Sequence, residues 1–247
     1  MLIITADDYG KTVQATDRIL ECFSCGRITS TSAMVFMEDS ERSAALSLQT
    51  EMEIGLHLNF TTPFSSDKIS QRFRECHDRV ISYLTSNKLA VIIYNPLLAG
   101  TFNYLFNLQK FEFIRLYGRP PDFYNGHHHM HLCANMLAGS IIPNGSRVRR
   151  SFTFDRGEKN PFNRFYRHIL DKSVSNKFIS TDSFFSIVTN HTERLENIFS
   201  RAVENTVEIE VHPENNEELN LLLSTQYQYM LDLVHIGKFA DLDKKSE

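Results

Sequence analysis

The 247-residue chain lacks any long apolar segment. Its longest, Leu89 to Gly100, is interrupted by Asn95 and Pro96 and is far shorter than the roughly 20 residues that span a bilayer. The sequence enters an apolar strand pattern at Leu2, and no basic segment followed by an apolar one marks a signal peptide. We therefore expect a soluble cytoplasmic protein that does not associate with a membrane.

Cysteine is also scarce, because the chain has only Cys22, Cys25, Cys76 and Cys133. Without a secretion signal, four cysteines in a chain of this length favour reduced thiols over disulfides. Cys22 and Cys25 have the spacing of a redox or zinc pair. They fall late in a predicted helix and no second pair accompanies them, so we interpret them as ordinary helix thiols.

Positive charge is not in excess, since the formal net charge is -4. The one basic cluster, Arg147 to Arg150, is too short for a nucleic-acid surface. We therefore expect no nucleic-acid partner. Within the cluster, Arg147 and Arg150 are better interpreted as local anchors.

Short apolar segments alternate with longer amphipathic ones, a pattern typical of βα units around a parallel sheet. Seven strands are predicted, at 2–6, 32–36, 53–58, 122–126, 148–153, 178–185 and 207–212. Seven helices are predicted, at 12–25, 39–48, 68–87, 97–117, 163–172, 192–204 and 217–236. The length suits one barrel, and no repeat or linker divides the chain. We expect an α/β fold, an irregular seven-stranded (β/α) barrel, with residues 1–247 as a single domain.

Alternation along two predicted strands places polar side chains inside this barrel. In 207–212 the odd-numbered residues are apolar, whereas Glu208, Glu210 and His212 share the opposite face. In 53–58 the inward face carries His57, and we expect Gly55 to leave room beside it. Buried polar groups are costly unless they are paired or bind a ligand. At the carboxyl end of a barrel strand they therefore indicate a functional site.

Three groups of metal-ligand side chains lie at the ends of predicted strands. Asp7 and Asp8 follow the first strand, His57 ends the third, and 127–131 carries four histidines. Two imidazoles and one carboxylate leave coordination positions free for water and substrate, as catalytic metal sites do. One aspartate would bind the metal and the other accept a proton, although a turn and helix cap explains the pair equally well. In an extended chain, the odd-numbered histidines of 127–131 would share one side.

Motifs along most of the chain resemble the YdjC-like carbohydrate deacetylases, which include the bacterial chitooligosaccharide deacetylases. The Ala-Asp-Asp-Tyr-Gly element at 6–10 and the His-x-His-x-His element at 127–131 are together quite specific. The resemblance also includes 27–32, 55–59, 117–121, 182–185, 208–213 and 223–242. It implies an irregular barrel that hydrolyses the acetamide of an N-acetylated sugar or short oligosaccharide.

The resemblance also implies roles for individual residues. Asp8, His57 and His127 would bind a divalent metal, with Asp7 as general base. His212 would act as general acid or orient the substrate. The family metal is magnesium or zinc, and the donor set favours zinc or another later transition metal. Relatives are often oligomeric, so a homo-oligomer is expected on resemblance alone.

Six further side chains are expected to contact the substrate: His129, His131, Arg147, Arg150, Phe184 and Phe185. Either arginine would anchor the substrate or keep Asp7 ionised, and either second-shell histidine could donate a proton. The two phenylalanines would stack on a sugar ring, although a place in the core is an equally good interpretation.

Departures from the family pattern leave other functions open. Asn125 stands where the family often has aspartate, which motivates a sugar-binding pseudoenzyme as an alternative, and Glu210 replaces a residue that is usually apolar. Hydrolysis of another bond by the same metal site is a further alternative. A non-haem iron oxygenase shares the two-histidine, one-carboxylate triad but has a different scaffold. A phosphatase is less favoured because no glycine-rich phosphate loop is present.

Overall fold

The computed structural model describes residues 1–154, 161–189 and 191–246, and the description below is confined to them. One parallel sheet organises the fold, with strand order β4-β3-β2-β1-β6-β5. Its strands are β1 (Leu2–Tyr9), β2 (Ser30–Ala33), β3 (Glu53–Leu58), β4 (Tyr124–Gly126), β5 (Ser183–Ser186) and β6 (Val207–Val211). The predicted α/β class and parallel sheet are confirmed. The interpretation of residues 1–247 as one domain stays a prediction.

Helices alternate with these strands. The α-helices are α1 (Val13–Ser24), α2 (Ser40–Ser47), α3 (Gln71–Ser86), α4 (Ala99–Tyr117), α5 (Ala134–Ala138), α6 (Pro161–Lys177), α7 (Thr192–Glu204), α8 (Asn216–Leu222) and α9 (Thr225–Leu231). Short 3-10 helices are η1 (Pro96–Leu98), η2 (His127–Leu132) and η3 (Phe239–Ser246). The single helix predicted at 217–236 is wrong, because the Ser224 hydroxyl accepts from the Tyr227 amide and starts a second helix.

The prediction of seven strands is also wrong. Across the described residues the sheet has six strands and forms an incompletely closed, curled barrel. The segment predicted as a strand at 148–153 makes only isolated bridges, Tyr124 to Val148 and Arg147 to Ile179. It still lies between the two edge strands, since the Arg149 amide donates to the Tyr124 carbonyl of β4 and the Thr153 amide donates to the Phe184 carbonyl of β5. This irregular segment partly fills the gap in the barrel wall.

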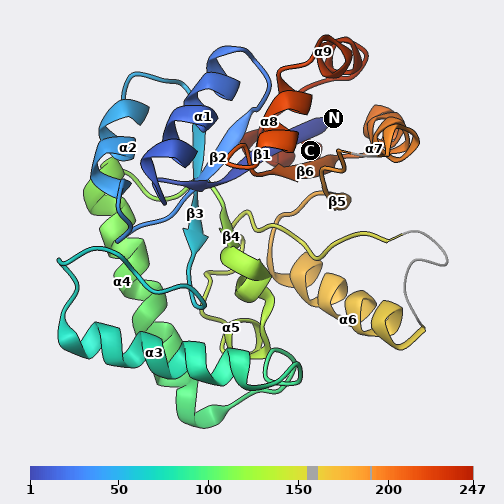
Figure 1. Ribbon diagram of the computed structural model, residues 1–247. Coiled ribbons are helices and arrows are strands. Elements are labelled where there is room, and N and C mark those ends of the chain that lie inside the picture. Colours follow the sequence, from blue (N-terminus) through green and yellow to red (C-terminus); the bar gives the residue numbers. More distant parts are fainter. Residues whose placement is uncertain (155–160, 190, 247) are drawn as a thin grey trace.

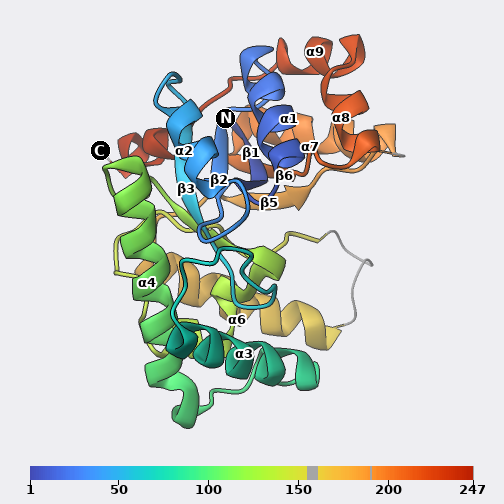
Figure 2. The same cartoon turned by 60° about the vertical axis from the view of Figure 1, so that its left-hand side comes forward.

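The outward side chains of the strands form the main core with the surrounding helices. Val207, Ile209 and Val211 of β6 are fully buried there, as their alternation predicts. In both views α3 and α6 lie below the sheet, on the side toward which β3 points, and α4 reaches down to them (Figures 1 and 2). None of the described helices combines the length and apolar character that a membrane span requires.

The inside of the barrel is layered. Its amino-terminal end is closed by an apolar cluster of Ile3, Phe123, Phe239 and Leu242. The Phe123 and Phe239 rings stack with centroids 4.0 Å apart. A Cβ on Gly55 would lie 2.5 Å from the Phe123 ring, so this glycine makes room for Phe123 rather than for His57. The expectation for Gly55 is therefore corrected. Polar side chains occupy the opposite, carboxyl-terminal end.

Candidate metal centre

A β-bulge lets two consecutive aspartates serve one site. In a regular strand Asp7 and Asp8 would point to opposite faces. Here the pairing of β1 with β2 shifts between Ala6 and Tyr9, and Asp8 has a φ of 69°. This bulged backbone turns the Asp8 carboxylate toward His57, the same histidine that Asp7 approaches. The left-handed conformation is unfavourable for a residue with a Cβ, and strain of this kind is typical of functional sites.

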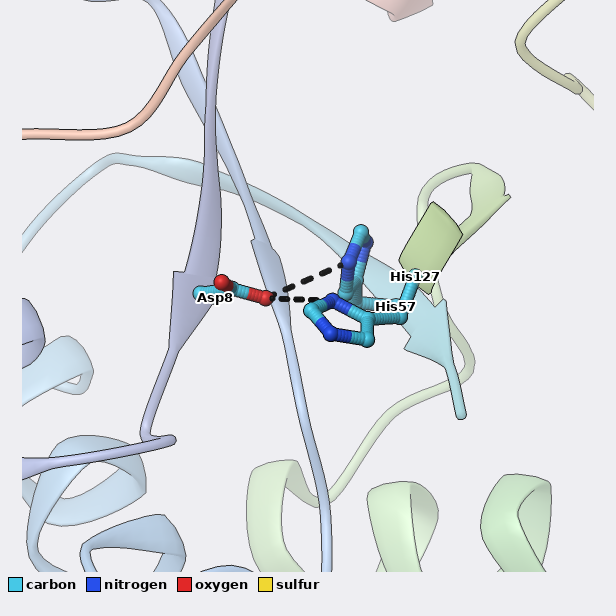
Figure 3. Close-up of side chains that lie close together, drawn as sticks. All are labelled: Asp8, His57 and His127. Atoms are coloured by element: carbon cyan, nitrogen blue, oxygen red, sulfur yellow. Dashed lines mark ion pairs between the residues drawn. The ribbon is translucent and has the colours of Figure 1, made fainter. Parts of the chain in front are cut away.

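Asp8, His57 and His127 converge from three elements, β1, β3 and η2 (Figure 3). The Asp8 Oδ1 atom lies 3.0 Å from His127 Nδ1 and 3.4 Å from His57 Nε2. One ligand atom from each residue lies within 4.8 Å of the others. The three residues that the sequence proposed as metal ligands are thus brought together.

The donor atoms fit a divalent metal. Asp8 Oδ1 and His57 Nε2 are buried and have no hydrogen-bond partner among the described residues, although they face one another. His57 Nδ1 lies 2.8 Å from Asn125 Oδ1, an acceptor, so Nδ1 carries the proton and Nε2 presents its lone pair. Two imidazole nitrogens and one carboxylate oxygen suit zinc or another later transition metal better than magnesium. The arrangement leaves room in the coordination shell for water.

The second oxygen of Asp8 is held by a cation. Lys11 Nζ lies 2.9 Å from Asp8 Oδ2 and 3.5 Å from a carboxylate oxygen of Glu214. Burial alone would raise the pKa of Asp8, but the nearby imidazoles of His127 and His57 lower it far below its ordinary value. Asp8 therefore stays ionised, with one oxygen on Lys11 and the other directed at the histidines.

Asp7 is held by several donors. Its Oδ1 accepts from Ser32 Oγ at 2.8 Å and from Asn125 Nδ2 at 3.1 Å. Arg149 donates to both carboxylate oxygens, at 2.5 and 2.9 Å. Burial alone would raise the pKa of Asp7, but Arg149, and after it His57, lower it far below the ordinary value. Asp7 is an ionised carboxylate beside the three metal-ligand candidates.

Arg149 is the residue that sequence reasoning missed. It is fully buried and also donates to Glu208 at 2.7 Å and to Glu210 at 3.1 Å. Its guanidinium lies 4.8 Å from the centroid of the Phe184 ring. Burial raises the pKa of Glu210 well above its ordinary value; Arg149 opposes this shift, and the charges of Asp7 and Glu208 add to it. The inward alternation of Glu208 and Glu210 was the signal that could have indicated a buried cation.

The histidine cluster is not extended, so the prediction that His127, His129 and His131 share one side is wrong. It forms η2, in which His128 and His129 have φ of 52° and 58°. His131 is fully buried and its Nε2 donates to the Arg149 carbonyl at 3.0 Å. It therefore holds the segment that carries Arg149 in place and is not exposed to a substrate. His129 Nε2 lies 3.7 Å from Glu210. Burial lowers the pKa of His129 to about 2 and of His131 to about 3, so both are neutral.

The structure does not bring Arg147 and Arg150 to the aspartate and histidine trio. Arg147 pairs with Asp243 at 2.5 Å and donates to the Asp122 carbonyl. Arg150 pairs with Asp171 of α6 at 2.9 Å and donates to the carbonyls of 181 and 182. Arg149, between them, is the arginine that reaches Asp7.

The two phenylalanines of β5 differ in direction. Phe184 is fully buried inside the barrel, stacked on Phe152 with centroids 4.6 Å apart. Phe185 belongs to the main core, 5.6 Å from the Arg201 guanidinium. His212 follows β6, and its side chain is 37% exposed. The charge of His212 contributes to lowering the pKa of Asp7, which shows that His212 lies near Asp7. Because His212 is also partly exposed, it lies at the solvent-facing mouth of the site, unlike Phe184 and Phe185.

A hollow of about 240 Å³ lies beside the histidine cluster. It is lined by Val91, His128, His129, Leu132, Ser151, Phe152, Tyr166, Arg167 and Leu170. His128 joins it to the trio, since the His127 and His128 rings are 4.1 Å apart. Aromatic rings next to hydrogen-bonding groups suit a ligand with both apolar and polar faces.

Comparison with solved structures shows the fold. A crystal structure from Enterococcus faecalis V583, described as that of a proposed cellobiose-phosphate cleavage protein, matches with a TM-score of 0.68. The match covers 98% of each chain at 16% sequence identity. At this identity the likeness concerns the fold alone.

Sequence comparison shows the family. Chitooligosaccharide deacetylases from Proteus mirabilis (strain HI4320) and Serratia marcescens are each 29% identical to this chain over 133 residues, which is 53% of the chain. The aligned part covers 50% and 51% of those proteins, so the chain spans about half the length of the curated relatives it matches. The family model described as YdjC-like protein matches residues 1–233. With its parallel sheet and its aspartate and histidine trio, the chain belongs to the YdjC-like protein family.

Proposed function

We propose that this protein is a metal-dependent hydrolase that removes the acetyl group from an N-acetylated sugar or a short oligosaccharide. The observation that carries the proposal is the pair of unpartnered buried atoms, Asp8 Oδ1 and His57 Nε2, which face each other beside His127. The family membership and the chitooligosaccharide deacetylases among its relatives support the sugar substrate.

Asp8, His57 and His127 would hold the divalent ion. When bound, such an ion supplies Lewis acidity, which lowers the pKa of water and stabilises negative charge on a carbonyl oxygen. Everything else is done by side chains of this chain. Lys11 keeps the outer oxygen of Asp8 in place, and Asn125 keeps the bare nitrogen of His57 directed inward.

Asp7 is the proposed proton acceptor. Within the part of the chain that the structure describes, its Oδ2 accepts one hydrogen bond, from Arg149, whereas its Oδ1 accepts three, so Oδ2 is the oxygen with spare accepting capacity. The arginine keeps Asp7 ionised and correctly oriented, at the cost of some basicity.

His212 is the proposed proton donor to the leaving amine. It lies at the mouth of the site and its ring is partly exposed, so it can approach a bound sugar. Its backbone amide donates to Glu218 at 2.6 Å, which fixes the turn after β6. An imidazole suits proton donation because its unperturbed pKa lies near neutrality.

The hollow beside His128 and His129 supports binding of the rest of the substrate. Phe152 and Tyr166 present aromatic surface there and Arg167 presents a hydrogen-bond donor. These groups complement a sugar ring, which has apolar faces and polar edges. Phe184 is covered by Phe152 and Arg149, so its proposed stacking on a sugar would require Phe152 to move.

The test is acetate release from N-acetylglucosamine and from chitooligosaccharides of increasing length. The protein is stripped with a chelator and reloaded with zinc, cobalt, manganese or magnesium. Release that depends on the metal, and that His57→Ala abolishes, supports the proposal. The exposed His235→Ala is the matched control and should behave as the unmodified protein.

Metal binding without acetate release from any of these sugars would contradict the deacetylase proposal. Sugar binding under the same conditions would then favour a binding protein on this fold. If the unmodified protein binds no divalent metal, the proposal that Asp8, His57 and His127 form a metal site is wrong.

A further inference from the structure

Asn125 connects two parts of the site that act separately. It lies on the inner face of β4 and is fully buried. Its Oδ1 accepts from His57 Nδ1 at 2.8 Å, and its Nδ2 donates to Asp7 Oδ1 at 3.1 Å. One side chain thus orients a metal-ligand candidate and also donates to the proposed base. An amide suits both contacts because it has an acceptor at one end and a donor at the other.

The charges around Asn125 explain why an amide rather than a carboxylate stands there. Asp7, Glu208 and Glu210 all accept from the fully buried Arg149. Three acids facing one guanidinium already exceed the positive charge that it supplies. An aspartate at 125 would add a fourth acid about 3 Å from Asp7, whose partner Arg149 is already shared among three acids.

We propose that Asn125 is a positioning residue that fixes His57 for metal binding, and that its neutrality is required because Glu210 is present. Asn125 and Glu210 act on the same charges, since Arg149 Nη1 contacts both Asp7 and Glu210 while Asn125 contacts Asp7. This inference rests on the metal site of the proposed function. It adds that position 125 and position 210 are energetically coupled.

Two readouts test it, and neither needs turnover. The first is zinc affinity, measured by competition with a chromophoric chelator. His57 Nδ1 has two acceptors in reach, Asn125 Oδ1 at 2.8 Å and Ser32 Oγ at 3.0 Å. Asn125→Ala removes the nearer one and should weaken zinc binding about tenfold to a hundredfold, the usual effect of deleting such a partner. The Tm of metal-free Asn125→Ala should stay close to that of the metal-free unmodified protein, because the substitution acts on zinc binding rather than on folding.

The second readout is the Tm of the metal-free protein in a double-mutant cycle. Asn125→Asp should lower the Tm, and the loss should be smaller when Glu210→Gln is also present. Asn220→Asp, the same change at an exposed position of α8, is the matched control and should leave both readouts unchanged. If Asn125→Asp alone does not fold, recovery of folding in the double variant supports the coupling equally well.

Unchanged zinc affinity in Asn125→Ala would overturn the positioning role. An equal loss of Tm from Asn125→Asp with and without Glu210→Gln would overturn the coupling. Failure of the unmodified protein to bind any divalent ion would instead contradict the proposed function. The Tm cycle would still test the coupling in that case, so the two failures are distinguishable.

Discussion

Arg149 donates to both carboxylate oxygens of Asp7, at 2.5 and 2.9 Å, although the two residues are 142 positions apart in the chain. This ion pair joins the irregular segment after Ser146 to the central strand β1. It is fully buried, and the same guanidinium also binds Glu208 through Nε and Glu210 through Nη1. The pair is therefore both a part of the site and a connection across the open part of the barrel.

Loss of this cation should be severe. Arg149→Met leaves three buried acids without their shared partner, and breaking one buried ion pair usually costs about 3–5 kcal/mol. We expect a large fall in Tm at pH 7, and a smaller one for Arg149→Lys, which keeps the charge but has fewer donors. Thermal unfolding followed by circular dichroism measures both. An unchanged Tm in Arg149→Met would show that the cluster tolerates the loss by protonation of its acids.

Replacement of Lys11 should tighten metal binding. Its ammonium lies 2.9 Å from Asp8 Oδ2 and competes with a divalent cation for the same carboxylate. Lys11→Met removes this positive charge, and we expect affinity for zinc to rise roughly tenfold. Lys11→Arg keeps the charge and serves as the control. Isothermal titration measures the affinity, and weaker binding in Lys11→Met would show that the lysine acts mainly by orienting Asp8.

Stability should fall on acidification because of buried neutral histidines. Burial lowers the pKa of His77 from 6.5 to about 4. The centroid of its ring lies 4.3 Å from the centroid of the Phe64 ring. As the pH falls, His77 is therefore protonated in the unfolded chain before it is protonated in the folded protein. Its contribution to the free energy of unfolding is complete above about pH 6.5 and is lost as the pH falls toward 4. The contribution of His77 is up to about 3 kcal/mol.

Urea unfolding at pH 7.5, 5.5 and 4.5 tests this assignment when the unmodified protein is compared with His77→Gln. The variant should lose less stability across this range than the unmodified protein does. His131 adds a similar dependence that His77→Gln leaves in place. Parallel pH profiles of the two proteins would rule out His77 as a source.

Gly55 should not tolerate a side chain. Its added Cβ would meet the Phe123 ring at 2.5 Å inside the closed end of the barrel. We expect Gly55→Ala to cost about 1–3 kcal/mol of unfolding free energy through overpacking. Gly100→Ala, in α4 with no atom within 4 Å of the added Cβ, should instead stabilise the protein slightly. Equal stability of the two variants would mean that the Phe123 ring is free to move aside.

Much of the site could be predicted because it follows local rules. Side-chain alternation in β6 indicated Glu208 and Glu210 as inward, and strand ends indicated Asp8 and His57. Parallel strands bring their carboxyl ends to one edge, so the convergence of these groups needed no knowledge of the exact fold.

The rest depends on contacts that no local pattern encodes. Arg149 lies in a segment without regular strand pairing, and its partners are distant in sequence. Its neighbours Arg147 and Arg150 carry the same charge, so only the three-dimensional course of the segment distinguishes them. The left-handed backbone of His128 and His129 is likewise not indicated by the sequence pattern, and the His129 ring packs against Phe152, which is distant in the sequence.

The floor of the barrel has a consequence for how the protein folds. Leu2 of the central strand donates to the His235 carbonyl and accepts from the Gly237 amide, at 2.8 and 2.9 Å. Phe239, which follows, completes the apolar floor, and its amide donates to Glu53 at 2.7 Å. The central strand β1 thus obtains these partners from a segment that follows all six strands of the described sheet in the sequence. Contacts of such large sequence separation form slowly, so during translation the floor of the barrel stays open until the segment around Phe239 has been synthesised.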